Sequence, residues 1–265
     1  PYKKLSIEQK REFLRHRGAS QFSQFLHGEQ GALLVASQLV SCAPTYQAKL
    51  YAASQAFDEA RHVEAFTKYI QKRSKLMYPV GSGLKSLLDK ILTDERWDLK
   101  LIGMQIIIEG LALAAFNTAK AVTPDPVLRD ILHLIIRDEA RHVTFGVNYL
   151  EDFIENLTEE EREDRAMFAY EACVISKERL FPTDVFRKFG WDEDEARQFS
   201  NKAGFATEFQ RLLFSRVVPN LSRIGLLTDE VRPLYDKLGV LEFESHSPDG
   251  DISWAELEKP LDLSA

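Results

Sequence analysis

A six-residue segment that occurs twice constrains this chain more than any other feature of its sequence. Residues 58–63 (DEARHV) recur without change at 138–143, 80 positions later. Glu29 and Glu109 are also 80 positions apart, and each precedes the glutamate of its own repeat by 30 residues. The chain therefore contains two related halves, and each half carries one isolated glutamate and one Glu-x-x-His motif.

Helical periodicity dominates the chain, and no strictly alternating run bounded by hairpin turns interrupts it, so we predict an all-α fold. The third long helix is expected to begin at Thr93 as its N-cap, and the fourth at Pro126 with Asp125 as its N-cap. Short links make the helices of each pair antiparallel, and a long segment at 74–92 joins the two pairs. This order predicts a ferritin-like four-helix bundle. The first three long helices are expected at about 19–42, 45–72 and 93–122.

We expect the whole chain, 1–265, to form a single all-α domain. Its bundle covers about residues 19–156, additional C-terminal helices cover about 157–245, and a tail covers 246–265. Two of the added helices are expected to begin at capping boxes. These boxes are formed by Thr158 with Glu161 and by Asp192 with Glu195.

The repeated Glu-x-x-His motifs suggest a metal centre. Side chains three positions apart share one face of a helix, so each motif presents a carboxylate and an imidazole together. Four carboxylates packed in an apolar bundle would repel one another unless protons or cations compensated them. Two dications do so, and carboxylate with imidazole and no thiolate favours iron or manganese, with Fe/Fe and Mn/Fe both open. The candidate metal ligands are Glu29, Glu59, His62, Glu109, Glu139 and His142.

This pattern resembles the ferritin-like di-iron carboxylate superfamily over about residues 19–152. The resemblance is to its oxygenase and oxidase members, which include bacterial di-iron hydroxylases, aminobenzoate N-oxygenases and ribonucleotide reductase small subunits. It implies two iron ions per chain and O₂ as co-substrate. A small organic substrate and an external electron donor are also expected.

The resemblance also implies partners for the two histidines. In the hydroxylases, the aspartate before each motif glutamate holds the histidine of the opposite half. Asp58 would then bond His142, and Asp138 would bond His62, which agrees with the usual carboxylate partner of a metal-bound imidazole. An arginine three residues after each aspartate would neutralise it, namely Arg61 and Arg141.

Several positions differ from the patterns of individual branches. Phe66 stands where reductase subunits carry a radical tyrosine, so no tyrosyl radical is expected. Leu113 and Ala112 stand where hydroxylases and desaturases carry threonine. Ile135 stands where aminobenzoate oxygenases carry a further histidine, and His133 lies on another helix face, so a seventh ligand is not expected.

We predict an O₂-dependent oxygenase or oxidase that acts on a small hydrophobic or aromatic molecule. The chain continues for more than a hundred residues beyond His142, farther than in ferritins and rubrerythrins. An iron-storage ferroxidase, a reductase-like oxidase and a metal-free interaction module remain alternatives. The residues expected around the substrate are Gln105, Ala112, Leu113, Phe116, Phe66 and Gly146.

Composition excludes some partners and leaves others open. The net charge of −7 at pH 7 favours neither nucleic acid nor an anionic membrane as a partner. The apolar stretch 101–119 carries one charge, Glu109, and is interpreted as the centre of a bundle rather than a membrane span. Two cysteines fit a cytoplasmic location, and a homodimer is an open alternative. Three histidines without matched partners are interpreted as surface residues: His16, His27 and His246.

Overall fold

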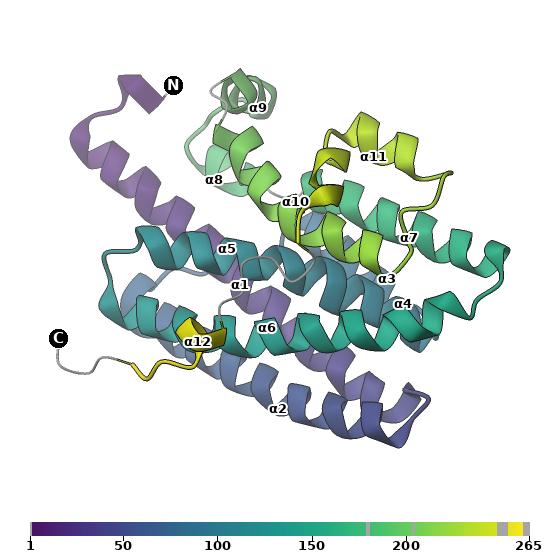
Figure 1. Ribbon diagram of the computed structural model, residues 1–265. Helices are drawn as coiled ribbons and strands as arrows, with labels where there is room; N and C mark the ends of the chain where they lie inside the picture. The colour runs from purple at the N-terminus through teal and green to yellow at the C-terminus, as the bar shows by residue number, and fades with distance from the viewer. Residues whose placement is uncertain (1, 179–180, 203–204, 248–253, 262–265) are drawn as a thin grey trace.

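The computed structural model describes residues 2–178, 181–202, 205–247 and 254–261. These residues form helices joined by turns and contain no strand, so the predicted all-α fold is confirmed (Figure 1). Three long helices and one composite helix form the bundle. They are α1 (Ile7–Cys42), α2 (Tyr46–Tyr69), the run of α4 (Trp97–Leu101), η3 (Ile102–Glu109) and α5 (Gly110–Val122), and α6 (Pro126–Glu155).

The first helix begins earlier than the sequence analysis predicted. Ser6 and Gln9 form a reciprocal capping box, in which the Gln9 backbone N–H donates to Ser6 Oγ at 3.2 Å. The second helix begins after Thr45, whose hydroxyl accepts from the Ala48 backbone N–H at 3.2 Å. It continues into a π-helical turn, η2 (Ile70–Ser74).

The predicted start of the third long helix is wrong. Thr93 is the last residue of a separate helix, α3 (Ser82–Thr93), and its hydroxyl donates to the Asp89 carbonyl at 2.7 Å. This helix extends to Thr93 because its apolar side packs into the core. The buried Lys100 ammonium then donates to the Ile91 and Leu92 carbonyls at 3.0 and 3.2 Å, which satisfies the end of α3.

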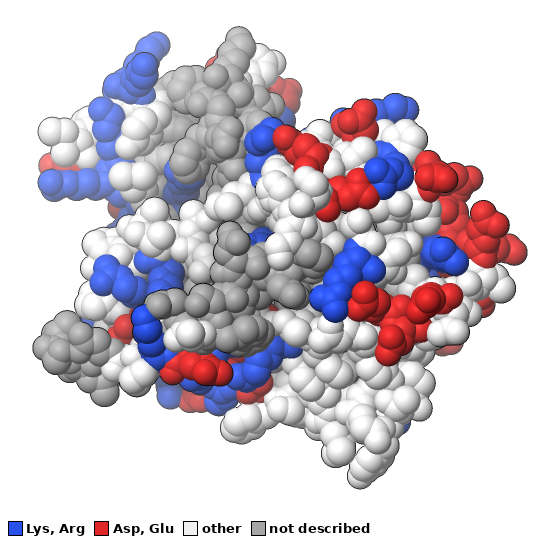
Figure 2. Space-filling view, in the orientation of Figure 1, with Lys and Arg blue, Asp and Glu red and all other residues white. Residues whose placement is uncertain are grey.

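The fourth helix begins as predicted. Pro126 is its first residue, and the Asp125 carboxylate accepts from the Val127 backbone N–H at 3.0 Å. The capping box of Thr158 and Glu161 is also present, with the Glu161 N–H donating to the threonine hydroxyl at 3.2 Å. Figure 2 shows acidic side chains gathered over this end of α7. Their negative charge interacts favourably with the positive N-terminal end of the helix dipole.

Apart from one short 3₁₀ helix before α1, the elements outside the four-helix bundle are α3 in the long connection and a series of helices after α6. At the start of α9, Asp192 accepts from the Glu195 backbone N–H at 2.9 Å, as that predicted box requires. Residues 248–253 and 262–265 of the expected tail lie outside the described residues. The remaining elements are η1 (Tyr2–Lys4), α7 (Glu159–Glu178), α8 (Thr183–Lys188), α9 (Glu193–Lys202), α10 (Phe205–Arg223), α11 (Arg232–Leu238), η4 (Leu241–Ser245) and α12 (Trp254–Leu257).

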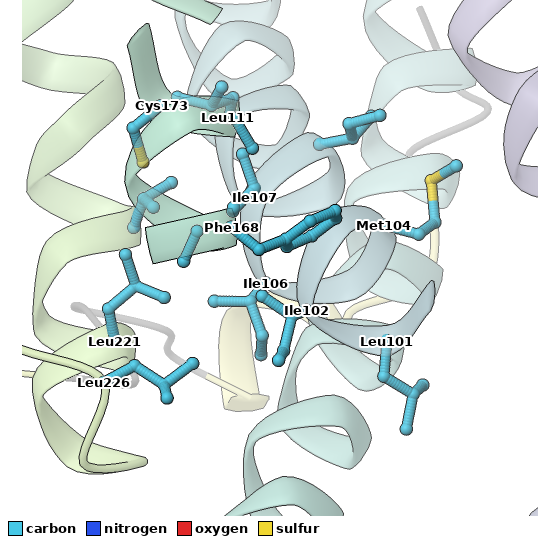
Figure 3. Packing of buried hydrophobic residues seen from close by; sticks show 14 of the residues in the cluster. Leu101, Ile102, Met104, Ile106, Ile107, Leu111, Phe168, Cys173, Leu221 and Leu226 are labelled. Carbon is cyan, nitrogen blue, oxygen red and sulfur yellow. The ribbon is translucent and has the colours of Figure 1, made fainter. Parts of the chain in front are cut away.

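The composite third helix is the centre of the protein. Within the described ranges, Trp97–Val122 is the one helical stretch long and apolar enough to cross a membrane, and 94% of its most apolar window is buried inside the fold. Figure 3 shows Phe168 and Cys173 of α7 beside Ile107 and Leu111 of this stretch. The protein interior therefore accounts for its apolar character, as the sequence analysis proposed.

The prediction that unmatched histidines lie on the surface is wrong for His16. That side chain is buried, and its ring nitrogens lie 2.8 Å from the Tyr78 hydroxyl and 2.9 Å from Glu12. His27 is half-buried, and its Nε2 lies 2.9 Å from the Tyr78 carbonyl. The long connection folds over α1 and covers both rings, whereas His246 is exposed as expected.

Candidate metal centre

The fold brings the six candidate ligands together in its interior. They come from four separate helical segments, and each is at most 5% exposed. One glutamate lies on α1, one ends η3, and each Glu-x-x-His pair lies on α2 or α6. The ligands are Glu29, Glu59, His62, Glu109, Glu139 and His142.

These residues form two overlapping groups, and the ligand atoms within each group lie within 4.8 Å of one another. We call them the Glu29 position and the Glu109 position after the glutamate that is unique to each. Glu59 and Glu139 belong to both groups. Two carboxylates shared between two adjacent positions are suited to bridging a pair of cations. The Glu29 position is completed by His62, and the Glu109 position by His142.

Both imidazoles direct Nδ1 toward the carboxylates. His62 Nδ1 lies 3.0 Å from Glu29 Oε2 and 3.1 Å from Glu139 Oε1. His142 Nδ1 lies 3.1 Å from Glu59 Oε1 and 3.7 Å from Glu139 Oε2. In each ring Nδ1 is therefore the atom placed to ligate a metal.

Each Nε2 meets an aspartate from the other half of the bundle. His62 Nε2 lies 3.2 Å from Asp138, and His142 Nε2 lies 3.3 Å from Asp58. An Nε2–H that donates to a carboxylate leaves Nδ1 with a lone pair, which selects the tautomer a metal requires. Burial alone would raise the pKa of Asp58, but hydrogen bonds from His142 and Arg61 outweigh this effect and lower the pKa to about 2.

Two arginines join these aspartates into one network. Arg61 bonds Asp58, and it bonds Asp138 at 3.1 Å. Arg141 bonds Asp138 at 2.8 Å and Asp58 at 3.3 Å. The arginine side chains are 44% and 45% exposed, so the network extends from the buried histidines to the surface.

Several atoms of the buried cluster have no hydrogen-bond partner among the described residues. Within the described residues, Glu59 Oε2, Glu109 Oε2 and both Glu139 oxygens accept no hydrogen bond, and His142 Nδ1 makes none. Unpaired buried oxygens are costly unless a proton or a cation compensates them. Two dications would satisfy these atoms, and the donor set of carboxylates with two imidazoles fits iron or manganese. The residues present therefore fit a dinuclear centre.

The charges of the cluster lead to the same requirement. Burial and the neighbouring Glu139 carboxylate raise the pKa of Glu29 well above its ordinary value. Burial does the same for Glu109. Burial alone would also raise the pKa of Glu59, but the adjacent His142 and His62 imidazoles hold it well below its ordinary value. Without metal, some of these carboxylates must therefore hold protons.

The predicted substrate residues separate into two groups. Phe66, Leu113 and Phe116 are buried in one apolar cluster, and Ala112 packs against it. The Phe66 and Phe116 ring centroids are 5.9 Å apart. Gln105 and Gly146 instead meet each other where η3 packs on α6, and a Cβ at Gly146 would lie 2.6 Å from Gln105 Cβ. The prediction took four residues from the third helix and one from each motif helix, and helical periodicity alone does not specify which of them face one another.

Sequence reasoning missed two residues of α2 beside the centre. Gln55 Nε2 donates to Glu109 Oε1 at 2.8 Å and, at the longer distance of 3.4 Å, to Glu59 Oε1. The Tyr51 ring centroid lies 6.5 Å from that of His142. Both residues precede Glu59 by multiples of four, so they share its helix face, and this spacing could have identified them.

The structure also shows what replaces a seventh ligand. Ile135 is buried in the same apolar cluster as Phe66. His133 Nδ1 lies 2.9 Å from the Lys120 ammonium, and its Nε2 lies 3.3 Å from the Lys259 carbonyl. Neither residue belongs to the two ligand groups of the described chain.

A helical bundle with two carboxylate-histidine groups that share two glutamates defines the class of dimetal carboxylate proteins. The family model described as p-aminobenzoate N-oxygenase AurF matches residues 1–225 of the chain. The chain belongs to this family of ferritin-like di-iron oxygenases, which confirms the resemblance drawn from the repeats. None of the curated proteins searched matches the chain.

Proposed function

We propose that the protein is a non-haem dimetal oxygenase that uses O₂ to oxidise a small hydrophobic or aromatic molecule. One observation carries the proposal: two buried ligand groups share Glu59 and Glu139, and three of the oxygens of these two residues accept no hydrogen bond from any described residue. The family match supports the oxygenase assignment. We propose two iron ions, with a manganese–iron pair as the alternative.

Bound metal would supply the redox chemistry that activates O₂. The residues of the chain would hold and orient the metal ions. Asp58 and Asp138 fix the tautomer of the two imidazoles, and the carboxylates provide the negative charge that two cations require. The surrounding apolar side chains exclude water from the centre.

The apolar cluster beside the centre supports a hydrophobic or aromatic substrate. Phe66, Phe116 and Leu113 present no charge and no hydroxyl group. The name of the family model points to an aromatic amine as the substrate class. We propose that electrons come from an external donor and that the enzyme is cytoplasmic.

Metal analysis tests the proposal directly. Protein loaded anaerobically with Fe(II) and desalted is expected to retain two metal ions per chain. His62→Ala combined with His142→Ala is expected to remove both, because each position loses its imidazole. A metal content near zero in the wild-type chain would overturn the proposal, and so would a content that the double variant leaves unchanged.

A second experiment distinguishes the oxygenase from a ferroxidase. The Fe(II)-loaded protein is mixed with O₂, a reductant and a panel of aromatic amines, and products are identified by mass spectrometry with ¹⁸O₂. We expect label in an organic product, and we expect Ala112→Phe to block its formation while metal content stays unchanged. Rapid oxidation of many equivalents of Fe(II), without a labelled product, would instead indicate a ferroxidase.

A further inference from the structure

The two halves of the bundle carry the same ligands but different neighbours. Gln55 lies four residues before Glu59, whereas the equivalent position in the second half is Ile135. Gln105 lies four residues before Glu109, whereas the equivalent position in the first half is Phe25. Two amides therefore stand beside the Glu109 position where the repeat places apolar side chains beside the Glu29 position.

These two amides form a chain of hydrogen bonds that ends on a ligand. Gln105 Nε2 donates to Gln55 Oε1 at 3.0 Å, and Gln55 Nε2 donates to Glu109 Oε1 at 2.8 Å. Metal binding keeps this order, because Glu109 then loses any proton it holds, an ionised carboxylate only accepts, and Gln55 must present its NH₂ group to it. Both glutamines are at most 1% exposed, so no bulk water competes for these bonds.

A glycine leaves the space that Gln105 occupies. A Cβ at Gly146 would lie 2.6 Å from Gln105 Cβ, which is too close for two carbon atoms. The repeat has Phe66 at the equivalent position, and Phe66 packs with Phe25 and Phe116. The second half therefore holds an amide pair where the first half holds an aromatic cluster.

The two positions differ in which residue orients their glutamate. In the Glu109 position, Gln55 holds Glu109 Oε1, Glu109 Oε2 makes no hydrogen bond within the described chain, and His142 Nδ1 lies 3.1 Å from Glu59 Oε1. In the Glu29 position, Glu29 Oε2 is hydrogen-bonded to His62 Nδ1 at 3.0 Å. Glu29 is therefore oriented by its own fellow ligand, whereas Glu109 is oriented by Gln55, which is not a ligand and stays in place when metal binds. A preorganised site binds more tightly than one that must rearrange.

We infer that Gln55, locked by Gln105, is a positioning residue that makes the two metal positions unequal, so that the Glu109 position fills first. The inference rests on the proposed function, since it requires a dinuclear centre. It adds an order of loading and assigns that order to an amide pair outside the ligand set.

Stepwise titration of the metal-free chain with Mn(II) tests the inference, with free Mn(II) measured by electron paramagnetic resonance. The wild-type chain is expected to bind two ions in separate steps. Glu109→Ala is expected to remove the tighter step, and Glu29→Ala the weaker one. Gln55→Ile, which copies the residue of the other half, is expected to weaken the tighter step by about 10- to 100-fold and to change the weaker step by less than about threefold.

Two further variants keep the test independent of any single fold defect. Gln105→Leu removes the hydrogen bond that holds Gln55, and Gly146→Ala displaces Gln105. Both variants should weaken the tighter Mn(II)-binding step by a smaller factor than Gln55→Ile. Ile135→Leu is the matched control at the equivalent position and should change neither step. Circular dichroism melting verifies that each variant is folded.

The outcomes separate the inference from the proposed function. A wild-type chain that binds no Mn(II) contradicts both. Two bound ions with equal affinities contradict the inference and leave the dinuclear centre standing. The inference is equally overturned if folded Gln55→Ile and Gln105→Leu leave the tighter step unchanged, or if they weaken both steps alike.

Discussion

The first half of the bundle, α1 with α2, and the second half, α4 through α6, carry one ligand set in two different settings. Glu29 lies within the regular helix α1, whereas Glu109 ends the π-helical segment η3. A π-helical segment changes which side chains face a given neighbour, and such segments are frequent at functional sites. The six ligands follow the repeat closely, while the residues around them do not. The two halves therefore agree in the candidate ligands and differ in what surrounds them.

The surroundings differ in a consistent way. Phe25 and Phe66 of the first half pack with Phe116, and their ring centroids lie 4.7 to 6.0 Å apart. The equivalent positions in the second half, Gln105 and Gly146, pack against each other. One side of the centre is thus aromatic, and the other side carries polar amides. Substitutions on the two sides should therefore have different consequences.

Truncation of the aromatic side should destabilise the fold strongly. Phe66→Ala removes a fully buried ring, so we expect the free energy of unfolding to fall by about 3–5 kcal/mol. The matched control is Phe57→Ala on the same helix, whose side chain is 67% exposed and which should change stability by less than about 0.5 kcal/mol. Urea unfolding measures both. Similar losses for the two variants would show that the aromatic cluster is not a packed core.

Substitution of the aspartates should separate the two metal positions. Asp138→Asn weakens the support of His62, and Asp58→Asn that of His142. Each change should weaken metal binding at the corresponding position by about 10- to 100-fold. Asp98→Asn is the control, because Asp98 is equally buried but bonds Arg165. Mn(II) titration measures the effects, and equal losses at both positions in each variant would contradict the crossed assignment.

Metal should stabilise the fold more as pH rises. The pKa values of Glu29 and Glu109 are raised in the folded metal-free chain, so it keeps protons that the unfolded chain has released. Its stability therefore falls as pH rises above the ordinary carboxyl pKa, about 4.3. Metal ions replace these protons and remove the loss.

Melting curves with and without Mn(II) measure this effect. We expect the increase in Tm to be several degrees larger at about pH 8 than at about pH 5.5. The His62→Ala and His142→Ala double variant should show no metal-dependent increase at either pH. An increase that is larger at the lower pH would contradict the assignment of the raised pKa values.

No stable tyrosyl radical is expected when the reduced protein meets O₂. Tyr69 and Tyr149 lie seven residues beyond their histidines, about 10 Å along the helix, and bond Asp125 and Thr45. Tyr51 is nearer, but its hydroxyl has no hydrogen-bond partner among the described residues to take its proton. Electron paramagnetic resonance tests this expectation. A near-stoichiometric tyrosyl signal that is lost in Tyr51→Phe, Tyr69→Phe or Tyr149→Phe would contradict it.

The helices of the bundle could be predicted where the signals were local. Pro126 with Asp125 marked the start of α6 correctly, because a cap acts within one turn of its helix. The prediction at Thr93 was wrong because threonine can end a helix as well as begin one, and the residues next to Thr93 do not show that α3 precedes it. His16 was misplaced for a related reason, because Tyr78 reaches it from 62 residues away.

The six candidate ligands could be predicted from the order of residues alone. A Glu-x-x-His spacing places both side chains on one helix face, and the exact repeat at an offset of 80 residues links the two motifs and the two isolated glutamates. The tertiary structure decided the rest: that Asp138 meets His62, that Gln55 holds Glu109, and that Gly146 makes room for Gln105. The physical reason is that helical periodicity specifies which residues of one helix point the same way. Which residues of another helix they meet depends on how the helices pack, and in this protein two identical motifs acquire different neighbours through that packing.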